Sequence, residues 1–340
     1  MEFLYQYGLF LAKTLTLVFG IIFTFSALIA MALKSRAKGE EGTLVIYPIN
    51  EKLDDVRSHM QSETLSKQSL KKWHKSQKAQ EKQQKKLIDD QNRLFIIRFE
   101  GDMRASEVEE LREVISAIVE VASPADEVLV ILESAGGFVH SYGLAASQLD
   151  RLRQKNLYVT AAIDKVAASG GYLMACVANR IIAAPFAIVG SIGVVAQLPN
   201  FHKLLEKHHI DYEIHTAGEY KRTLTMFGHN TEKARHKFQE EIEQTHGLFK
   251  DYITHHRAQV DIEKVATGEH WHGVQAIDLK LVDELQTSDD FILHKAKSMQ
   301  VFEIGFEIKQ KLADKIASGM MMFLERSFMR WFPKTQKTPV

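Results

Sequence analysis

The feature that most constrains the fold is an alternation, beginning at Leu94, of β-rich apolar runs with segments of helical periodicity. Strands are expected at 94–99, 128–132 and 158–163, and helices at 108–121, around 144–152 and at 231–256. Because consecutive strands joined by helices pair in parallel through crossover connections, this pattern predicts an α/β fold built from βα repeats. Functional residues of such a sheet are expected at the carboxyl ends of its strands.

Local signals refine this prediction. Ser106 and Glu109 fit a capping box at the start of the first helix. The apolar stretch from Ile181 to Pro199 is interpreted as two short buried strands around a turn rather than as a membrane span, because Pro and Gly interrupt it. Tyr212–Thr216 is expected to form a further strand.

The N-terminus differs from the rest of the chain, since no charged residue occurs between Thr14 and Leu33. About 20 apolar residues suffice for a helix to cross the hydrocarbon core, so residues 1–36 are predicted to form one transmembrane anchor. A cleaved signal peptide is the alternative, supported only by a weak small-residue exit. Three basic residues follow the span, Lys34, Arg36 and Lys38, and this charge bias alone would place the body in the cytoplasm.

Composition divides the remainder into three parts. Residues 37–93 are predicted to form a charged spacer that begins with a short strand-like piece, Thr43–Pro48. From Glu51 to Arg93 this part is rich in Lys, Glu, Gln, Asp and Ser, which predicts either a solvated helix or a disordered linker. Residues 94–290 would form the folded domain. Residues 291–340 combine Met and aromatic residues with Lys and Arg, which indicates an amphipathic tail that contacts a membrane or a partner subunit.

Charge and cysteine content exclude several classes of protein. The 43 basic and 43 acidic residues balance, and no basic patch alternates with aromatics, so no nucleic-acid partner is expected. Cys176 is the sole cysteine and lies in an apolar stretch, which predicts a buried side chain and excludes an internal disulfide. Neither an HExxH motif nor paired cysteines accompany the 15 histidines, so neither a metal nor a cofactor is expected.

Three serines occur at glycine-rich strand ends: Ser134, Ser169 and Ser191. Ser169 is the candidate nucleophile, because the small residues around it, Gly170 and Gly171 among them, would let a peptide approach closely. A small-residue helix packed against a neighbour explains the same stretch. None of the three lies in a complete GxSxG motif, which disfavours an α/β-hydrolase.

A nucleophilic serine needs a base, and no histidine in the sequence pairs with an orienting carboxylate. A lysine can take that role if burial lowers its pKa from about 10.4 towards neutrality. Lys221 is the candidate because it follows Gly218 at an expected strand end. An ordinary surface lysine beside Arg222 is the alternative.

Six ordered segments, taken together, resemble the signal peptide peptidase A family of Ser/Lys proteases. They are Glu133–Gly137, Ala167–Tyr172, Val189–Val194, Gly218–Lys221, Gly268–Trp271 and Leu281–Glu284. The resemblance covers roughly 94–287, and the long N-terminal extension is most similar to the SohB branch. It implies that Ser169 attacks the scissile carbonyl, that Lys221 takes and returns the proton, and that Ser191 orients the lysine amine.

The resemblance also implies an oxyanion hole of backbone N–H groups from Gly136 or Gly137 and from Gly170. Two positions depart from the family pattern. The family commonly has proline where Ala135 stands, and many members have asparagine where Glu133 stands. Because proline would pre-set the turn, its absence predicts a looser loop with its donors retained.

At the level of the whole molecule the resemblance implies a ClpP/crotonase-like fold and a homo-oligomeric ring whose subunits share active sites. The substrates would be extended apolar peptides, such as remnant signal peptides or membrane-protein fragments. The family usually works on the extracytoplasmic face of the cell inner membrane, against the charge bias noted above. The sequence therefore predicts a membrane-anchored serine endopeptidase. A crotonase-like acyl-CoA enzyme and a catalytically degenerate membrane scaffold of the same fold are the alternatives.

Overall fold

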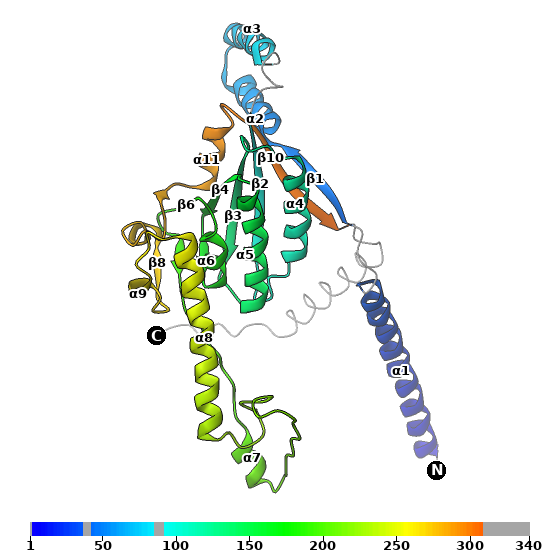
Figure 1. Cartoon of the computed structure of the whole chain (residues 1–340). Helices are drawn as coiled ribbons and strands as arrows, with labels where there is room; N and C mark the ends of the chain where they lie inside the picture. Colours follow the sequence, from blue (N-terminus) through cyan, green and yellow to red (C-terminus); the bar gives the residue numbers. More distant parts are fainter. Residues whose placement is uncertain (1, 37–41, 85–91, 309–340) are drawn as a thin grey trace, which may run out of the picture. The chain divides into compact units, whose positions relative to one another are not determined.

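The computed structural model describes residues 2–36, 42–84 and 92–308. The chain divides into two compact units (Figure 1). One unit contains the N-terminal helix α1 (Glu2–Arg36). The other spans Val45–Gly305 and contains every residue predicted to form the active site.

Helix α1 contains the predicted membrane anchor, and apolar side chains such as Phe10 and Phe23 are exposed along it. Within the part of the chain that the structure describes, no helix is both long enough and apolar enough to cross a membrane. The side chains of residues 25–36, in the second half of the predicted span, lie outside the described part. The single-pass anchor therefore stays a prediction. The amphipathic tail predicted over residues 291–340 starts too early, because Gln300–Ile308 forms a strand that pairs with the strand from Arg93, and residues 309–340 lie outside the described residues.

The sheet has the α/β organisation that the alternating pattern predicted. Its strands follow the order β1-β10-β2-β3-β4-β6-β9, while β5 pairs with β3 and β7, and β8 pairs with β7. The pairings from β10 through β9 and from β3 through β7 are parallel, whereas β7 and β8 are antiparallel. The strands are β1 (Gly42–Pro48), β2 (Arg93–Gly101), β3 (Glu127–Ser134), β4 (Tyr158–Ile163), β5 (Val166–Ala168), β6 (Arg180–Ala183), β7 (Ile188–Gly190), β8 (His270–His272), β9 (Glu284–Leu285) and β10 (Gln300–Ile308).

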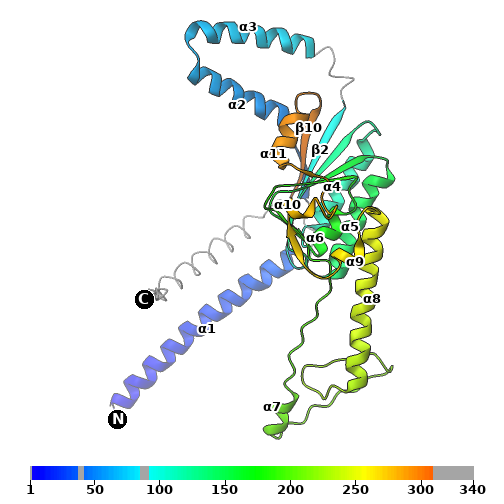
Figure 2. The same ribbon diagram turned by 90° about the vertical axis from the view of Figure 1, so that its left-hand side faces the viewer.

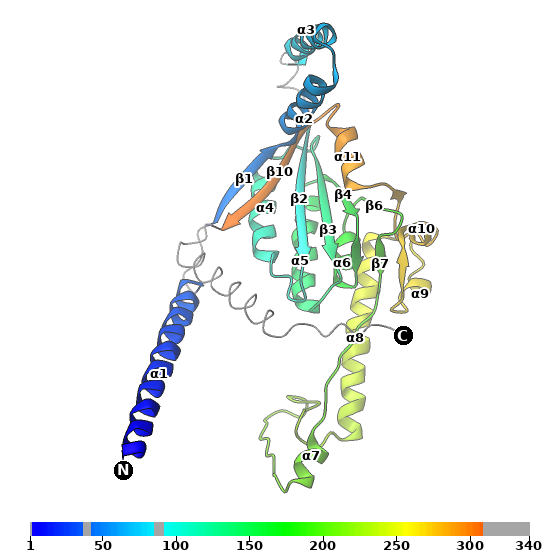
Figure 3. The same ribbon diagram turned by 180° about the vertical axis from the view of Figure 1, so that it is seen from behind.

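Helices α4 and α5 cover one face of this sheet, as a comparison of Figure 1 with the view from behind in Figure 3 shows. The predicted spacer, residues 37–93, contains a part of the sheet, because Gly42–Pro48 forms β1. The described residues that follow form α2 and α3, so of the two alternatives considered for the spacer the helical one is observed there. The helices are α2 (Ile49–Thr64), α3 (Lys67–Gln84), α4 (Val108–Val121), α5 (Val139–Gln154), α6 (Gly170–Ala175), α7 (His202–Lys207), α8 (Glu232–His256), α9 (Ile262–Val265), α10 (Gly273–Ala276) and α11 (Ser288–Lys295).

Both faces of the central strands are buried. This explains why the sequence of β2 is a nearly continuous run of apolar residues rather than an alternation of apolar and polar ones. Leu94 and Ile96 belong to a core cluster that includes Phe291 of α11. Phe99, on the opposite face, meets the ring of Tyr142 from α5 edge to face. The sheet is thus held between two apolar layers, and its strand ends are fixed in position.

Two local predictions were wrong. Helix α4 has Glu107, not Ser106, at its N-cap, because the Ser106 hydroxyl and N–H both bind the Asp102 carboxylate instead. No strand forms at Tyr212–Thr216, which has no regular secondary structure and is exposed. An apolar–polar alternation there finds no neighbouring strand to pair with, and the isolated segment gains nothing from an extended ladder. The two short strands predicted within Ile181–Pro199 are confirmed in outline as β6 and β7.

Candidate active site

Ser169 lies between strand β5 and helix α6, as the predicted strand–turn–helix arrangement requires. Its backbone has φ 51° and ψ −118°, a region that residues other than glycine rarely occupy. The Ser169 N–H donates to the Gly190 carbonyl at 2.8 Å, which fixes this conformation. The residue is half-buried, so its hydroxyl is held at the edge of the sheet on a constrained turn.

Ser191 is brought beside Ser169 by strand register. Ala168 of β5 is the parallel partner of Gly190 of β7, so the next residue on each strand is a serine. Ser191 also has a positive φ, 52°, and its N–H donates to the Glu269 carbonyl at 2.6 Å. The two serines therefore leave neighbouring parallel strands at the same edge.

The glycine loop, Ala135–Phe138, lies directly against the Ser169 turn. Strand β3 pairs with β4 along most of its length, and its last residue, Ser134, pairs with Ala167 of β5. Gly136 follows with φ +88°, and a Cβ atom there would lie 2.7 Å from both the Gly170 nitrogen and the Ser169 Cβ. Only glycine fits this contact, because a side chain would collide with the turn that holds Ser169.

The N–H groups of this loop differ in their availability. Gly136 N–H donates to the Ser134 hydroxyl at 3.0 Å, and Phe138 N–H donates to the Met103 carbonyl at 2.9 Å. Among the described residues, no acceptor pairs with the N–H of Gly137. Gly170 opens helix α6, where the first N–H groups lack intrahelical acceptors. Of the three glycines predicted for the oxyanion hole, Gly137 and Gly170 retain donors for a ligand, whereas the donor of Gly136 is used within the fold.

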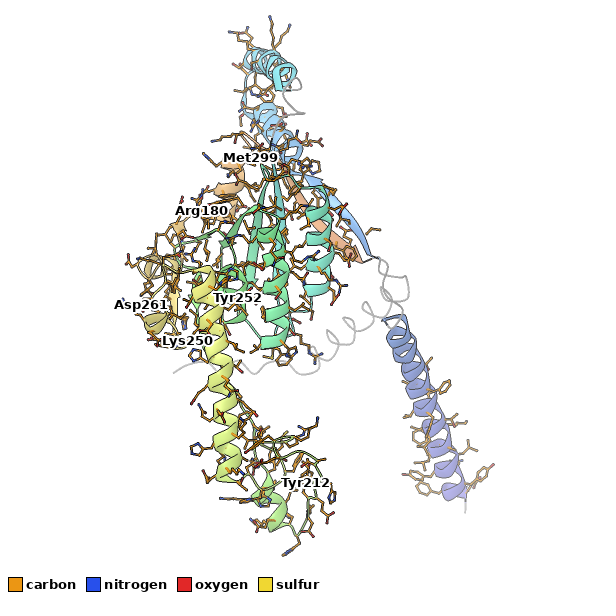
Figure 4. The ribbon with its side chains drawn as sticks, viewed as in Figure 1. Arg180, Tyr212, Lys250, Tyr252, Asp261 and Met299 are labelled. Atoms are coloured by element: carbon orange, nitrogen blue, oxygen red, sulfur yellow. The ribbon has the colours of Figure 1, made fainter. Side chains whose placement is uncertain are left out.

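Lys221 is not brought to Ser169 within the single chain. It lies in the segment between β7 and α8, its side chain is exposed, and its N–H donates to the Gly218 carbonyl at 3.2 Å. That segment, with α7, lies beyond the sheet beside the far end of α8 (Figure 2). Tyr212 marks it in Figure 4, whereas Tyr252, further along α8, lies near the sheet. In the single chain Lys221 is therefore exposed, whereas a lysine in a buried environment was expected from the sequence.

Tyr142 is a residue of the site that sequence reasoning missed. A Cβ atom at Gly170 would lie only 2.3 Å from Cγ of Tyr142, so the ring packs directly on the backbone that follows Ser169. Helical periodicity places an aromatic residue at this position of α5 in the core, but it does not distinguish a core tyrosine from one with a polar role. The useful signal would have been its place in the first turn after Gly136-Gly137.

Two further features bear on the chemistry of the site. Glu133, at a position where the sequence departs from the family pattern, pairs with Lys165 at 2.8 Å across β3 and β5, and both side chains are well exposed. Cys176 is fully buried, as predicted, and burial raises the pKa of its thiol. In the described part of the chain, no group of three or more His, Cys, Asp or Glu side chains is arranged to hold a metal ion.

The chain as a whole matches known proteins. Residues 2–149 match Peptidase family S49 N-terminal, and residues 151–301 match Peptidase family S49. The chain belongs to peptidase family S49. It is 47% identical over 326 residues to the "Probable protease SohB" of Haemophilus influenzae, a match that covers 92% of each chain. It is also 47% identical over 307 residues to the "Probable protease SohB" of Buchnera aphidicola subsp. Schlechtendalia chinensis, covering 87% of this chain and all of that one. The predicted resemblance, including the SohB branch, is confirmed.

Solved structures similar to this S49 peptidase are much more distant. The ClpP protease catalytic domain from Plasmodium falciparum aligns with a TM-score of 0.37 at 13% identity, covering 57% of this chain and 85% of that one. A variant of the 1510-N membrane-bound stomatin-specific protease, in complex with a substrate peptide, aligns with a TM-score of 0.42 at 12% identity, covering 68% of this chain and 99% of that one. The α/β assignment therefore stands on the strand order and register described above.

Proposed function

We propose that this S49 peptidase is a membrane-anchored serine endopeptidase in which Ser169 is the nucleophile and Lys221 the base. The observation that carries the proposal is the position of Ser169. Its turn has a strained backbone, and Ser191 follows the neighbouring parallel strand. The glycine loop lies so close to this turn that a Cβ atom added at Gly136 would be 2.7 Å from Cβ of Ser169. A half-buried serine on such a turn can meet a peptide carbonyl while backbone donors face the same point.

In the first chemical step, Oγ of Ser169 attacks the carbonyl carbon of the scissile peptide. The unprotonated amine of Lys221 takes the hydroxyl proton as the new C–O bond forms, and Ser191 hydrogen-bonds that amine to orient it. The tetrahedral intermediate then collapses. The C–N bond breaks, Lys221 returns the proton to the leaving amine, and an acyl ester on Ser169 remains.

The developing oxyanion would accept hydrogen bonds from the N–H groups of Gly137 and Gly170. Gly136 is left out of this pair because its N–H already donates to Ser134. Loss of a single oxyanion donor typically lowers the rate by about 10²–10³-fold. A water molecule, deprotonated by Lys221, then attacks the ester and releases the acid product with Ser169 restored.

A neighbouring copy of the chain is proposed to contribute Lys221. The lysine is exposed on a segment that lies beyond the sheet, and a lysine acts as a base only when its ammonium loses a proton, which burial favours. The same segment exposes large apolar residues, among them Phe201, Leu204 and Ile210. Packing of this segment against another subunit would bury both the apolar surface and the amine, in a homo-oligomeric ring.

The proposed substrates are extended apolar peptides, such as remnant signal peptides or membrane-protein fragments. Residues 191–201 follow β7 without regular secondary structure, and Val195 and Leu198 are exposed along them. A peptide can add to such an edge as an extra strand, with main-chain hydrogen bonds supplying affinity. Remnants of this kind would reach the enzyme at the membrane to which α1 is proposed to anchor it.

We propose a single-pass anchor in the cell inner membrane, with the protease body on the extracytoplasmic face. The uncharged sequence of Thr14–Leu33 supports the anchor, whereas Lys34 and Arg36 argue for the opposite orientation. A topology reporter fused after residue 290 tests the assignment. Activity of an extracytoplasmic reporter is expected, and activity of a cytoplasmic one would reverse the orientation.

The dyad is tested with purified full-length protein and an apolar fluorogenic peptide or casein. Ser169→Ala and Lys221→Ala are each expected to abolish cleavage while leaving the circular dichroism spectrum unchanged. Lys203→Ala serves as a matched control, because Lys203 is another exposed lysine of the same segment, and it should retain activity. Cleavage retained by either dyad variant would show that another residue performs the chemistry.

A further inference from the structure

We propose that Ser134 and Tyr142 are positioning residues, which form a buried hydroxyl relay that holds the glycine loop in the conformation needed for an oxyanion hole. The proposal rests on the function proposed above. Ser134 was one of three candidate serines in the sequence, and the structure separates it from the other two. Its side chain is 2% exposed and Tyr142 is fully buried.

The relay runs through three hydrogen bonds. Gly136 N–H donates to Oγ of Ser134 at 3.0 Å, Oγ of Ser134 lies 2.5 Å from the hydroxyl of Tyr142, and that hydroxyl donates to the Asp102 carbonyl at 2.7 Å. A backbone group of the glycine loop is thereby connected to the turn that follows β2.

Counting protons fixes the direction of the middle bond. A phenol carries one hydrogen, and Tyr142 gives its hydrogen to the Asp102 carbonyl. The Ser134 hydroxyl must therefore donate its hydrogen to the Tyr142 oxygen. A lone pair of Ser134 Oγ accepts the hydrogen of Gly136 N–H. Burial raises the pKa of Tyr142, so the phenol keeps the hydrogen that the relay needs. The Ser134 hydroxyl is fully engaged, which leaves it unavailable as a nucleophile.

The turn after β2 holds the other end of the glycine loop as well. The Asp102 carboxylate accepts from the N–H groups of Arg104 and Ser106, which gives the turn a fixed shape. Within that turn the Met103 carbonyl accepts from Phe138 N–H. The N–H groups on both sides of Gly137 are thus bound to one rigid turn, directly or through the relay, while the Gly137 N–H is left for a ligand.

Tyr142 also contacts the second donor of the proposed oxyanion hole. Its ring packs on Gly170, and Phe99 supports that ring edge to face at 6.5 Å between centroids. The hydroxyl of one residue therefore acts on the loop of Gly137, and its ring acts on the backbone of Gly170. Phenylalanine at this position would keep the ring contact and remove only the relay.

The test measures kcat and KM for an apolar peptide in Tyr142→Phe and Ser134→Ala. Each variant is expected to lower kcat by about 10- to 100-fold, somewhat less than outright loss of an oxyanion donor, with KM changed less than about twofold because ground-state binding is retained. The kcat of the double variant should be at most about threefold lower than that of the more impaired single variant. Each single substitution already interrupts the relay, so the two effects are not expected to add.

Two matched controls separate positioning from general stability. Tyr172→Phe removes another buried tyrosine bond to a carbonyl, that of Leu281 at 2.9 Å. Ser288→Ala removes another serine hydroxyl that is 2% exposed, bound to Asp164. Both should lower the melting temperature as much as the relay variants do, with kcat and KM unchanged.

Hydrogen exchange of residues 134–138 supplies a readout that needs no catalysis. Exchange at Gly136 is expected to be at least tenfold faster in Ser134→Ala than in wild type and unchanged in Ser288→Ala, because only Ser134→Ala removes the acceptor of that N–H. Exchange that is no faster, or kcat unchanged in both relay variants, would overturn the relay. Absence of peptide cleavage by the wild type would instead defeat the proposed function, and the exchange result would still decide whether the relay holds the loop.

Discussion

At the scale of single residues, the glycines differ in how much space a side chain would find at each position. Gly136 has a positive φ, and a Cβ atom added there would lie 2.7 Å from Cβ of Ser169, whereas a Cβ atom added at Gly143, seven residues later in α5, would have nothing within 4 Å. A methyl group at the first position must displace the backbone at Gly170, while at the second it would extend into open space.

Gly136→Ala is expected to lower kcat by more than about 100-fold, because the added Cβ separates the loop from the turn and disturbs both oxyanion donors. Gly143→Ala is the matched control. It should leave kcat unchanged and raise the free energy of unfolding by about 0.5–1 kcal/mol, since alanine loses less conformational entropy within a helix. Peptide kinetics and urea denaturation check the pair, and equal activity of the two variants would refute the close contact.

Asp126 is expected to make the stability of the fold depend on pH in the acid range. Burial opposes ionisation of this carboxylate, but hydrogen bonds from Arg93 and Ser123 outweigh it and lower the pKa of Asp126. Since the folded-state pKa lies below the unfolded value, the stabilisation is present above about pH 4 and is lost as the pH falls further, through the folded-state pKa.

Asp126→Asn should lower the free energy of unfolding at pH 7 by about 1.5–3 kcal/mol, the range for hydrogen bonds to a charged group, and should flatten the acid limb of the stability profile. Asp54→Asn, at an exposed i,i+3 pair with Arg57, should change stability by less than about 0.5 kcal/mol. Denaturant titrations from pH 3 to pH 7 measure both, and an acid limb as steep in Asp126→Asn as in wild type would contradict the assignment.

At the scale of elements, the sequence predicted strands where burial on both faces produces uninterrupted apolar runs, and β4 was predicted with its observed bounds. The prediction failed where a competing local contact, or the lack of a neighbouring strand, decides the outcome. The Ser106 capping box was lost to Asp102, and Tyr212–Thr216 had no strand to join. The ends of α8 illustrate the same contrast, because Thr231 caps its start through a local bond to Ala234 N–H, whereas its end depends on distant residues.

Arg257, at the end of α8, is 1% exposed and forms two hydrogen bonds with the Asp283 carboxylate and one with the Lys280 carbonyl. Arg257→Met is expected to lower the free energy of unfolding by about 1.5–3 kcal/mol, the range for hydrogen bonds to a charged group, because the side chain of Asp283 is 32% exposed and keeps part of its hydration. Arg235→Met, at an exposed pair on the same helix, should cost less than about 1 kcal/mol. Thermal and denaturant unfolding distinguish the two variants, and similar losses would show that the Arg257–Asp283 pair adds little.

At the scale of the whole molecule, the parallel arrangement of the strands was predictable, and the observed register brings Ser169, Ser191 and the glycine loop to one edge. The place of Lys221 was not, because the segment around it lies beyond the sheet and a single chain supplies no surface to bury it. The hydrogen bond between Ser134 and Tyr142 could not be predicted from the sequence either. The hydropathy of a tyrosine indicates that its ring can lie in a core, but it does not indicate which group its hydroxyl contacts.

A shared active site predicts complementation between inactive variants. When Ser169→Ala and Lys221→Ala chains are co-expressed in equal amounts, about a quarter of the sites in a mixed ring would pair an intact serine with an intact lysine from the neighbouring subunit. Purified mixed assemblies should therefore recover about a quarter of wild-type activity, while each variant alone stays inactive. No recovery in mixed assemblies would place both residues of the dyad in the same chain.

The central claim, that Ser169 is the nucleophile, is tested most directly by labelling full-length protein with a fluorophosphonate and locating the adduct by peptide mass spectrometry. The modification is expected on Ser169, and it should be absent from Ser134, whose hydroxyl is engaged, and from Ser191. Lys221→Ala should label at least about 100-fold more slowly, because the serine then lacks its base. An adduct on Ser134 or Ser191, or undiminished labelling of Ser169→Ala, would contradict the account.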